Sequence, residues 1–193
     1  EEVDAFLFRE RMNDMFNNQD LITNKEFDAW SSSRMQQDVF KDSQGHYIVQ
    51  HDPDDIYTTW WISASQGSNS IIGNKYYAGF TDYEVDYIPT SQAHDREVGF
   101  GGQYAFIPKG DSSVVYDMTV SGNGLLIRGS NSNGGAGHDD VLRFKDFSLY
   151  DLTTIFGAGN EPSKEVIDSY IQNQDKLTTR IPGINKIALD ELF

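Results

Sequence analysis

Short hydrophobic runs that alternate with polar positions fill the middle of the chain. Between His46 and Tyr150, clusters of Gly, Asn, Asp, Ser or Pro separate these runs, and no helical pattern lies between them. Successive side chains of a strand point to opposite faces of a sheet, so this alternation predicts strands with one buried face. The expected strands are 46–50, 56–63, 69–72, 75–83, 97–107, 113–120, 124–129 and 141–150.

The clearest alternation is in the run 113–120, where Val114, Tyr116 and Met118 occupy every second position. The segment Ser121-Gly122-Asn123-Gly124 follows it and tolerates positive φ, as tight connections require. We therefore expect 113–129 to form a β-hairpin. Many short strands separated by turns are typical of a mainly β protein, here a jelly-roll β-sandwich.

Helical periodicity is concentrated near the two ends of the chain. Residues 3–16 carry a heptad-like seam formed by Ala5, Phe8, Met12 and Met15. Two heptads are marginal as an isolated helix, so this one should dock on its own domain or form a coiled coil between copies, as in a homotrimer. A second helix should start at Glu161-Pro162-Ser163, and a short helical stretch is expected around Arg34 to Phe40.

These patterns predict a helical arm over residues 1–20, a sandwich over 21–160, and a short C-terminal helix and tail over 161–193. Of the 193 residues, 30 are acidic and 15 basic, which gives a net charge of −15. Such a surface repels phosphates and anionic headgroups, so neither nucleic acid nor a membrane is expected as a partner. The absence of cysteine excludes disulfides and thiolate metal sites.

Sequence motifs for catalysis are absent from the chain. There is no Gly-x-Ser-x-Gly, His-Glu-x-x-His or Walker loop. The run Gly157-Ala158-Gly159-Asn160 lacks the spacing of a dinucleotide fingerprint. We therefore expect a protein that is not an enzyme.

Adjacent tryptophans suggest a surface for binding sugars. Within the run 56–63, alternation should turn Trp60 inward and leave Tyr57 and Trp61 exposed, where aromatic rings can stack on a sugar ring. The segment Gly99 to Phe106 could line a groove with Arg96 and Tyr104. An equally simple interpretation is that other parts of the protein cover the face, and that a strand with a bulge explains the glycines.

Two acidic clusters offer oxygen ligands. His51-Asp52-Pro53-Asp54-Asp55 and His138-Asp139-Asp140 have ligands that suit calcium, although neither matches an EF-hand. Solvated turns explain both clusters as well. We expect no cofactor, with structural calcium as the alternative.

The segment Asp151 to Ser163, Asp-Leu-Thr-Thr-Ile-Phe-Gly-Ala-Gly-Asn-Glu-Pro-Ser, resembles a signature of Gram-positive bacteriophage tail and minor structural proteins. In that family it closes a jelly roll similar to a carbohydrate-binding module and precedes a short helix. Weaker similarities are Leu21 to Trp30, Gly73 to Tyr77 and Ile127 to Ser130, so the resemblance covers about 21–172. It implies a structural protein of the virion, located in a tail or head fibre.

The resemblance and the residues together lead to one functional expectation. The chain is expected in the virion as a non-enzymatic fibre or appendage protein that contacts other virion proteins and recognises host cell-wall glycan. The alternative is a carbohydrate-binding module of a bacterial secreted enzyme or adhesin. An appended module is usually a monomer, so the oligomeric state separates the two hypotheses.

Overall fold

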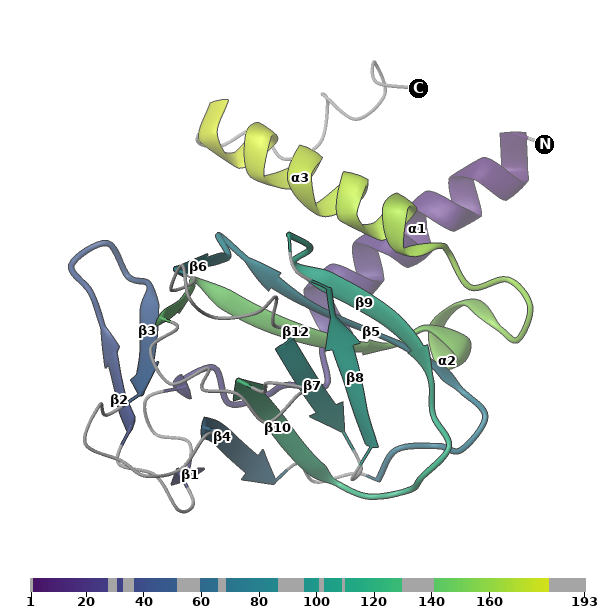
Figure 1. Cartoon of the computed structure of the whole chain (residues 1–193). Helices are drawn as coiled ribbons and strands as arrows, with labels where there is room; N and C mark the ends of the chain where they lie inside the picture. Colours follow the sequence, from purple (N-terminus) through teal and green to yellow (C-terminus); the bar gives the residue numbers. More distant parts are fainter. Residues whose placement is uncertain are drawn as a thin grey trace. The chain divides into compact units, whose positions relative to one another are not determined.

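The structure, a computed structural model, describes residues 2–27, 31–32, 37–51, 60–65, 69–86, 96–100, 103–108, 110–129 and 141–180 (Figure 1). The chain divides into two compact units, Glu1–Glu161 and Pro162–Phe193. Each unit is described by itself below. The first contains the strands that the structure describes, together with the helices α1 (Glu2–Asn18) and α2 (Leu152–Phe156).

One sheet of the first unit has five strands, and every neighbouring pair is antiparallel. In spatial order they are β1 (Ser31–Ser32), β4 (Trp60–Ser65), β10 (Gly124–Gly129), β7 (Arg96–Phe100) and β8 (Gln103–Ile107).

A second layer is built from two antiparallel stretches, ordered β2-β3-β11-β6 and β12-β5-β9. The strands are β2 (Gln37–Lys41), β3 (Tyr47–His51), β11 (Val141–Phe144), β6 (Glu84–Asp86), β12 (Asp146–Asp151), β5 (Lys75–Thr81) and β9 (Ser113–Asp117).

The pairing register is unchanged where these two stretches meet. Arg143 pairs with Glu84 in the first stretch, and Asp146 pairs with Thr81 in the second. Between these two pairs one side of the ladder advances by three residues and the other goes back by three, as in an uninterrupted antiparallel pair. The Lys145 amide donates to the Thr81 carbonyl at 2.8 Å. The two stretches therefore continue one another as a bent sheet, with Asp82 at the bend in a left-handed conformation (φ 48°), which Asp tolerates better than most residues.

The hydrophobic core lies between the two layers and draws side chains from both. Val98, Leu125 and Ile127 come from the five-stranded sheet, while Ala78, Leu142 and Leu149 come from the bent sheet. Burial alternates along β11 and the start of β12, as a sheet with one face on the core requires. The mainly β sandwich fold, with a helix at each end, is confirmed.

Aromatic rings form a compact group at one part of this core. The Phe144 ring lies 5.2 Å from that of Phe27, 5.7 Å from Tyr47 and 5.1 Å from Phe80, measured between centroids. Phe147 extends the group through Phe80 at 4.6 Å. Such rings bury large apolar areas and gain further from tilted and edge contacts.

The expected hairpin over residues 113–129 is wrong. Strand β9 pairs with β5, whereas β10 pairs with β4 and β7 in the other sheet. The segment between them therefore crosses from one layer to the other. Its backbone is held by Ser70, whose amide donates to the Gly122 carbonyl at 2.7 Å and whose hydroxyl donates to the Val120 carbonyl at 3.0 Å. A turn-like sequence does not specify which strands pair across it.

Three other local expectations also differ from the structure. Residues 37–41 form strand β2, although the sequence pattern predicts a helix around Arg34 to Phe40. Pairing with β3 satisfies this backbone, so tertiary context overrides a weak local helical preference. The run 69–72 is a loop, and 97–107 is divided into β7 and β8.

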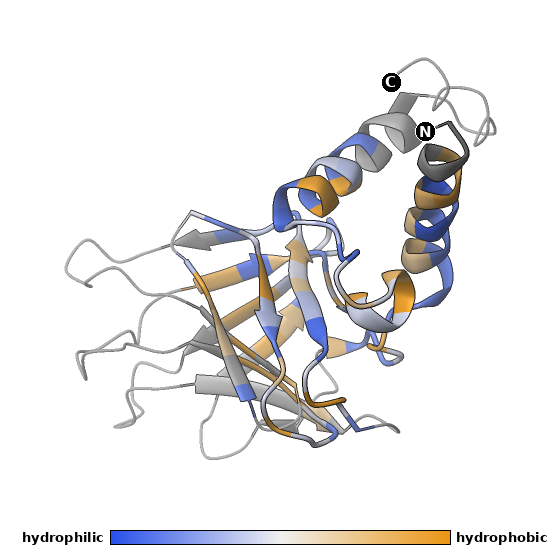
Figure 2. Ribbon diagram, turned by 90° about the vertical axis from the view of Figure 1, so that its right-hand side faces the viewer, coloured by the Kyte–Doolittle hydropathy of each residue, from blue (hydrophilic) through white to orange (hydrophobic). Residues whose placement is uncertain are grey.

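Helix α1 lies against the sandwich of its own chain (Figure 1). The Arg11 guanidinium donates to the Phe156 carbonyl at 2.9 Å. The Phe8 ring lies 5.7 Å from that of Phe156, and the Phe16 ring lies 5.5 Å from that of Tyr150. Figure 2 colours the helix by hydropathy, and hydrophobic residues recur along it between hydrophilic ones.

This docking changes the interpretation of the heptad seam. Met12 and Met15 are buried, and they lie on the helix face between Phe8 and Phe16. Within the chain these two side chains are already covered, whereas Phe8 is 37% exposed and the side chain of Ala5 lies outside the described residues. The oligomerisation role of Ala5, Phe8, Met12 and Met15 stays a prediction. Phe6 and Leu7 remain exposed. A trimer itself stays a prediction.

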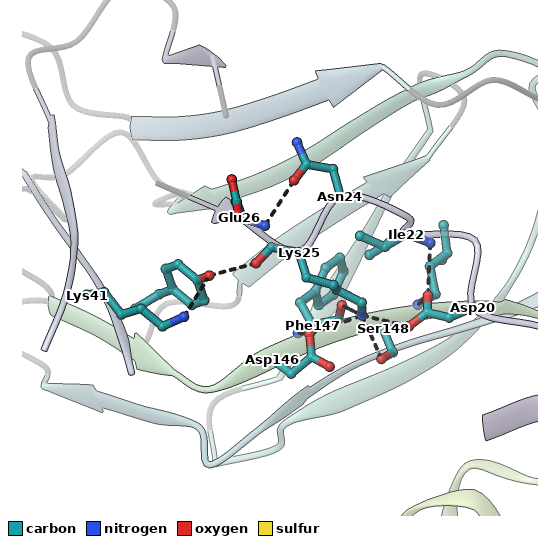
Figure 3. A network of polar contacts seen from close by, with 11 residues as sticks. Asp20, Ile22, Asn24, Lys25, Glu26, Lys41, Asp146, Phe147 and Ser148 are labelled. Atoms are coloured by element: carbon teal, nitrogen blue, oxygen red, sulfur yellow. Dashed lines mark hydrogen bonds and ion pairs between the residues drawn. The ribbon is translucent and has the colours of Figure 1, made fainter. Parts of the chain in front are cut away.

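Lys25 connects the segment after α1 to strand β12 (Figure 3). Its ammonium donates to Asp20 at 2.6 Å and to the Phe147 carbonyl at 2.7 Å, and lies 3.0 Å from the Asp146 carboxylate. Asp20 also accepts the Leu149 amide at 3.1 Å. The network holds residues 20–25 beside β12.

The second unit contains helix α3 (Lys164–Arg180). Lys164 and Asp168 form an ion pair at 2.8 Å one turn apart. Among the described residues, no helix has the length and hydropathy needed to cross a membrane.

Candidate functional site

The five-stranded sheet contains three of the four residues expected to bind sugar. Trp61 is in β4, Arg96 begins β7 and Tyr104 is in β8. Tyr57 lies outside the described residues. Residues from distant parts of the sequence therefore meet in one sheet.

Strand register places Trp61 and Tyr104 at positions on the same face. Trp61 is opposite Arg128, Arg128 is opposite Glu97, and Glu97 is opposite Phe106, two residues from Tyr104. Phe106 is 46% exposed, whereas its neighbours Ala105 and Ile107 are buried in the core. This row therefore belongs to the face directed away from the core.

Arg96 belongs to the alternate positions of β7, which lie on the opposite face from the row that contains Trp61. It shares these positions with Val98 and Phe100, which are both buried in the core. Register thus separates Arg96 from Trp61 and Tyr104, and places Phe106, the last residue of the expected groove segment, in the row with Trp61. We call the positions Trp61, Tyr104 and Phe106 the sheet platform. Its binding role stays a prediction.

A polar depression lies on the bent sheet, beside the turn that joins β2 to β3. Its volume is about 550 Å³, and it is open to solvent. We call it the turn depression; it is lined by Gln44, His46, Asp82, Tyr83, Glu84 and Arg143.

The β2–β3 turn fixes one wall of the turn depression. Asp42 accepts the backbone amides of Gln44 at 2.8 Å and His46 at 2.9 Å through the same carboxylate oxygen. Gly45 follows with φ 86°, a conformation that favours glycine. The sequence Asp-Ser-Gln-Gly between two apolar runs is a turn signature that could have predicted this hairpin.

Arg143 crosses from β11 toward that turn. Its Nη2 atom donates to Asp42 at 2.8 Å and to the Gln44 side-chain oxygen at 2.9 Å, and lies 3.1 Å from His46 Nδ1. Partial desolvation of Asp42 is outweighed by its backbone hydrogen bonds and by the Arg143 charge, so the pKa of this carboxyl lies below its ordinary value. Asp42 thus holds in place both Arg143 and the turn that carries Gln44 and His46.

Asp82 also lines the depression. Its carboxylate lies 3.7 Å from His46 Nε2 and 3.6 Å from the Lys145 ammonium. Both Asp82 and Lys145 are more than half exposed, so this ion pair contributes little to stability.

The Asp151–Ser163 motif forms a hydrogen-bonded corner in which Asp151 is the central acceptor. This buried carboxylate caps α2 by accepting the Thr154 amide at 3.0 Å. It also accepts the Tyr76 hydroxyl at 3.0 Å and the Asn74 amide group at 2.9 and 3.0 Å.

Glu161 closes the same corner from its other end. It accepts the Thr153 hydroxyl at 2.7 Å and the Gly159 amide at 2.8 Å. The Thr153 hydrogen bond is the main reason why the pKa of Glu161 is lowered. Gly157 and Gly159 have φ of 88° and 82°. The motif therefore has a structural explanation that involves no ligand.

Tyr76 gives the corner a measurable pH dependence. Burial, with the nearby Asp151 carboxylate, raises the pKa of Tyr76 to about 12 from its ordinary value of 10.0. Because the pKa is higher in the folded state, the contribution of Tyr76 to the free energy of unfolding is fully present below pH 10 and is lost as the pH rises through 12. We expect the free energy of unfolding of Tyr76→Phe to decrease less between pH 10 and pH 12 than that of the wild type. Urea unfolding at successive pH values measures it. An equal decrease in both proteins would contradict the raised pKa of Tyr76.

Metal binding has no support among the side chains that the structure describes. Within that part of the chain, no group of three His, Asp or Glu residues could hold a metal ion. The expected calcium clusters lie outside it, since residues 52–55 and 138–140 are not described. Calcium binding therefore stays a prediction.

The chain is similar to known proteins in structure, and no similarity in sequence accompanies this. No protein-family model and no curated protein sequence matches the chain. A Clostridium thermocellum xylanase structure (CBM22-1–GH10 modules of Xyn10B with xylohexaose) matches 69% of the chain over 28% of its own length, at 12% identity and TM-score 0.43. The chain thus corresponds to less than a third of that structure.

Two further solved structures are similar over their whole length. Accessory secretory protein 1, 2 and 3 of Streptococcus pneumoniae covers 67% of the chain and 98% of itself, at 13% identity and TM-score 0.36. TmCBM61 with β-1,4-galactotriose covers 69% and 99%, at 14% identity and TM-score 0.28. All three similarities are distant. The chain is a mainly β sandwich, and its family is left open by these comparisons.

Proposed function

We propose that this chain is a non-catalytic glycan-binding module that uses the sheet platform. The observation that carries the proposal is the register by which Trp61, Tyr104 and Phe106, from two separate parts of the sequence, fall on one face of the five-stranded sheet. The exposed Phe106 lies at one end of this row. Aromatic side chains on an open sheet provide flat surfaces for the apolar face of a sugar ring.

Charge narrows the class of glycan. At a net charge of −15, the chain repels uronic and other acidic polysaccharides. Neutral glycans avoid that repulsion. A neutral component of the bacterial cell surface is therefore the proposed ligand.

The proposed setting is the virion of a bacteriophage, in a tail or head fibre that assembles as a trimer. Its support is the resemblance of the Asp151–Ser163 segment to Gram-positive phage structural proteins. Exposed Phe6 and Leu7 on α1 offer apolar contacts for association. The alternative, an appended module of a secreted enzyme or adhesin, uses the same platform as a monomer. Light scattering of the full chain separates them, because a monomer at micromolar concentration counts against the fibre.

Replacement of Trp61 by alanine tests the platform. We expect the affinity for neutral cell-wall glycan to fall about 30-fold, since loss of an aromatic anchor costs about 2 kcal/mol or more. Isothermal titration against purified wall polysaccharide measures the change. The thermal unfolding midpoint should stay within a few degrees of the wild-type value.

The control is Ile72→Ala, which removes a 62% exposed apolar side chain from the loop before β5. This variant should bind as the wild type does. If the Trp61→Ala variant and the wild type bound the glycan with equal affinity, the proposal that the sheet platform binds it would be wrong.

A further inference from the structure

The turn depression is separate from the sheet platform. Arg143 and Glu84 belong to the bent sheet, whereas the platform belongs to the five-stranded sheet on the other side of the core. We propose that the turn depression is a second sugar-binding site, which takes one or two rings of a neutral glycan. This inference rests on the proposed glycan-binding function and adds a site to it.

Donors in the depression are already held in position. Arg143 uses Nη2 for its contacts with Asp42, Gln44 and His46. Among the described residues, Nη1 donates to no protein atom. Nε also has no hydrogen-bond partner, but it is buried, so Nη1 is the donor that the protein leaves for a ligand. An arginine fixed by a carboxylate loses little side-chain entropy when it binds a ligand.

Two carboxylates line the depression together with Arg143, one from β6 and one from the bend that precedes it. Asp82 and Glu84 flank Tyr83 in sequence, and all three line the depression. Glu84 is directly opposite Arg143 in register, yet the contacts of Arg143 go to the turn. Among the described residues Glu84 has no cationic partner. Its carboxylate therefore remains available to accept hydrogen bonds from adjacent hydroxyl groups.

Tyr83 supplies an apolar element to the same depression. Its ring is stacked on Phe80, with centroids 5.0 Å apart and an interplanar angle of 21°. Because Phe80 belongs to the core, the position of Tyr83 is set by packing. A fixed aromatic side chain next to planar donors and acceptors is a combination that suits a pyranose ring.

The mixture of charges selects a neutral hydroxylated ligand. An anion would meet Asp82, Glu84 and the net charge of −15. A cation would meet Arg143 and Lys145, whose ammonium lies 3.6 Å from Asp82. Sugar hydroxyls donate to the carboxylates and accept from the guanidinium at once, so they use both sets of groups. The volume of about 550 Å³ lies within the range of small-ligand sites.

The consequence is a bivalent module. Two weak sites on different sheets let one molecule engage two glycan chains, and this raises the apparent affinity for a dense polysaccharide surface without additional contacts at either site.

An NMR titration of the full chain tests the second site. The probes are hexaoses of glucose, xylose, galactose and N-acetylglucosamine, and the observed signals are Arg143 Nε–H, the Gln44 side-chain amide and the Trp61 indole N–H. We expect at least one hexaose to shift the Arg143 and Gln44 signals in a saturable manner. The double variant Asp82→Asn and Glu84→Gln should weaken that binding about tenfold, because it removes charged acceptors.

The control is Asp117→Asn, which makes the same carboxylate-to-amide change once, at a 69% exposed position on β9. It should leave all titrations unchanged. If the hexaoses shift the Trp61 signal only, the second site is overturned and the sheet platform stands. If they shift the Arg143 and Gln44 signals only, the second site stands and the platform fails. If no hexaose shifts any of these signals, both are overturned.

Discussion

Replacing Phe144 by alanine is expected to lower the free energy of unfolding by about 3–5 kcal/mol, the range measured for truncation of a buried Phe. Phe144 is fully buried, and its ring contacts those of Phe27, Tyr47 and Phe80. These residues come from the segment after α1 and from strands β3 and β5, so the ring lies where separate parts of the chain converge. Truncation leaves a cavity that fixed strands cannot close.

Urea unfolding followed by tryptophan fluorescence measures this effect. Phe144→Leu retains most of the volume and should cost less than half as much as Phe144→Ala. The exposed Phe106 on β8 provides a control in which the same truncation should change stability by less than about 0.5 kcal/mol. A loss below about 1 kcal/mol for Phe144→Ala would show that this aromatic group does not stabilise the sandwich.

Replacing Asp151 by alanine is expected to cost about 3–4 kcal/mol, because several groups lose their shared acceptor at once. The Tyr76 hydroxyl, the Asn74 amide group and the Thr154 amide all donate to this carboxylate. Tyr76 is itself buried, so its hydroxyl would lose an acceptor in a site that water does not reach freely. The cap of α2 is removed by the same change.

A second variant separates the charge of Asp151 from its role as an acceptor. Asp151→Asn keeps one side-chain oxygen and is a good helix cap, so we expect a loss of about 1–2 kcal/mol. Chemical denaturation measures both variants. If Asp151→Ala were no more destabilising than Asp151→Asn, the hydrogen bonds from Tyr76 and Asn74 would contribute nothing net, and the corner motif would need another explanation.

The hydrogen bonds of the corner explain why its motif is recognisable from the amino-acid sequence alone. Asp151, Thr153, Gly157, Gly159 and Glu161 bond mainly to one another and to the nearby strand end. Positive φ at the glycines and a carboxylate cap restrict residue type at fixed spacings. The functional residues of the two proposed sites carry no such restriction.

Alternation also predicts the faces of individual strands. The position of Trp61 pairs with that of Arg128, which is next to the buried Ile127, so the register places Trp61 in the set that alternates with the core positions. The exposure of the Trp61 ring stays a prediction. The nearby glycines suggest a groove that groups Arg96 with Tyr104, and the register separates the two. The turn depression could not be predicted from the sequence, because its lining residues come from three segments and Gln44 and Arg143 are almost a hundred residues apart.

The sequence by itself determined the mainly β class, the positions of most strands, the helix at each end and the capped corner, because period-two burial, helical periodicity and positive-φ glycines are local properties. Only the tertiary structure decided which strands pair, that β9 and β10 belong to different sheets, and that Met12 and Met15 are buried in their own chain. Pairing and docking depend on which apolar faces meet after the chain has folded back, and many partners satisfy the same local pattern. Both proposed sugar sites depend on that choice.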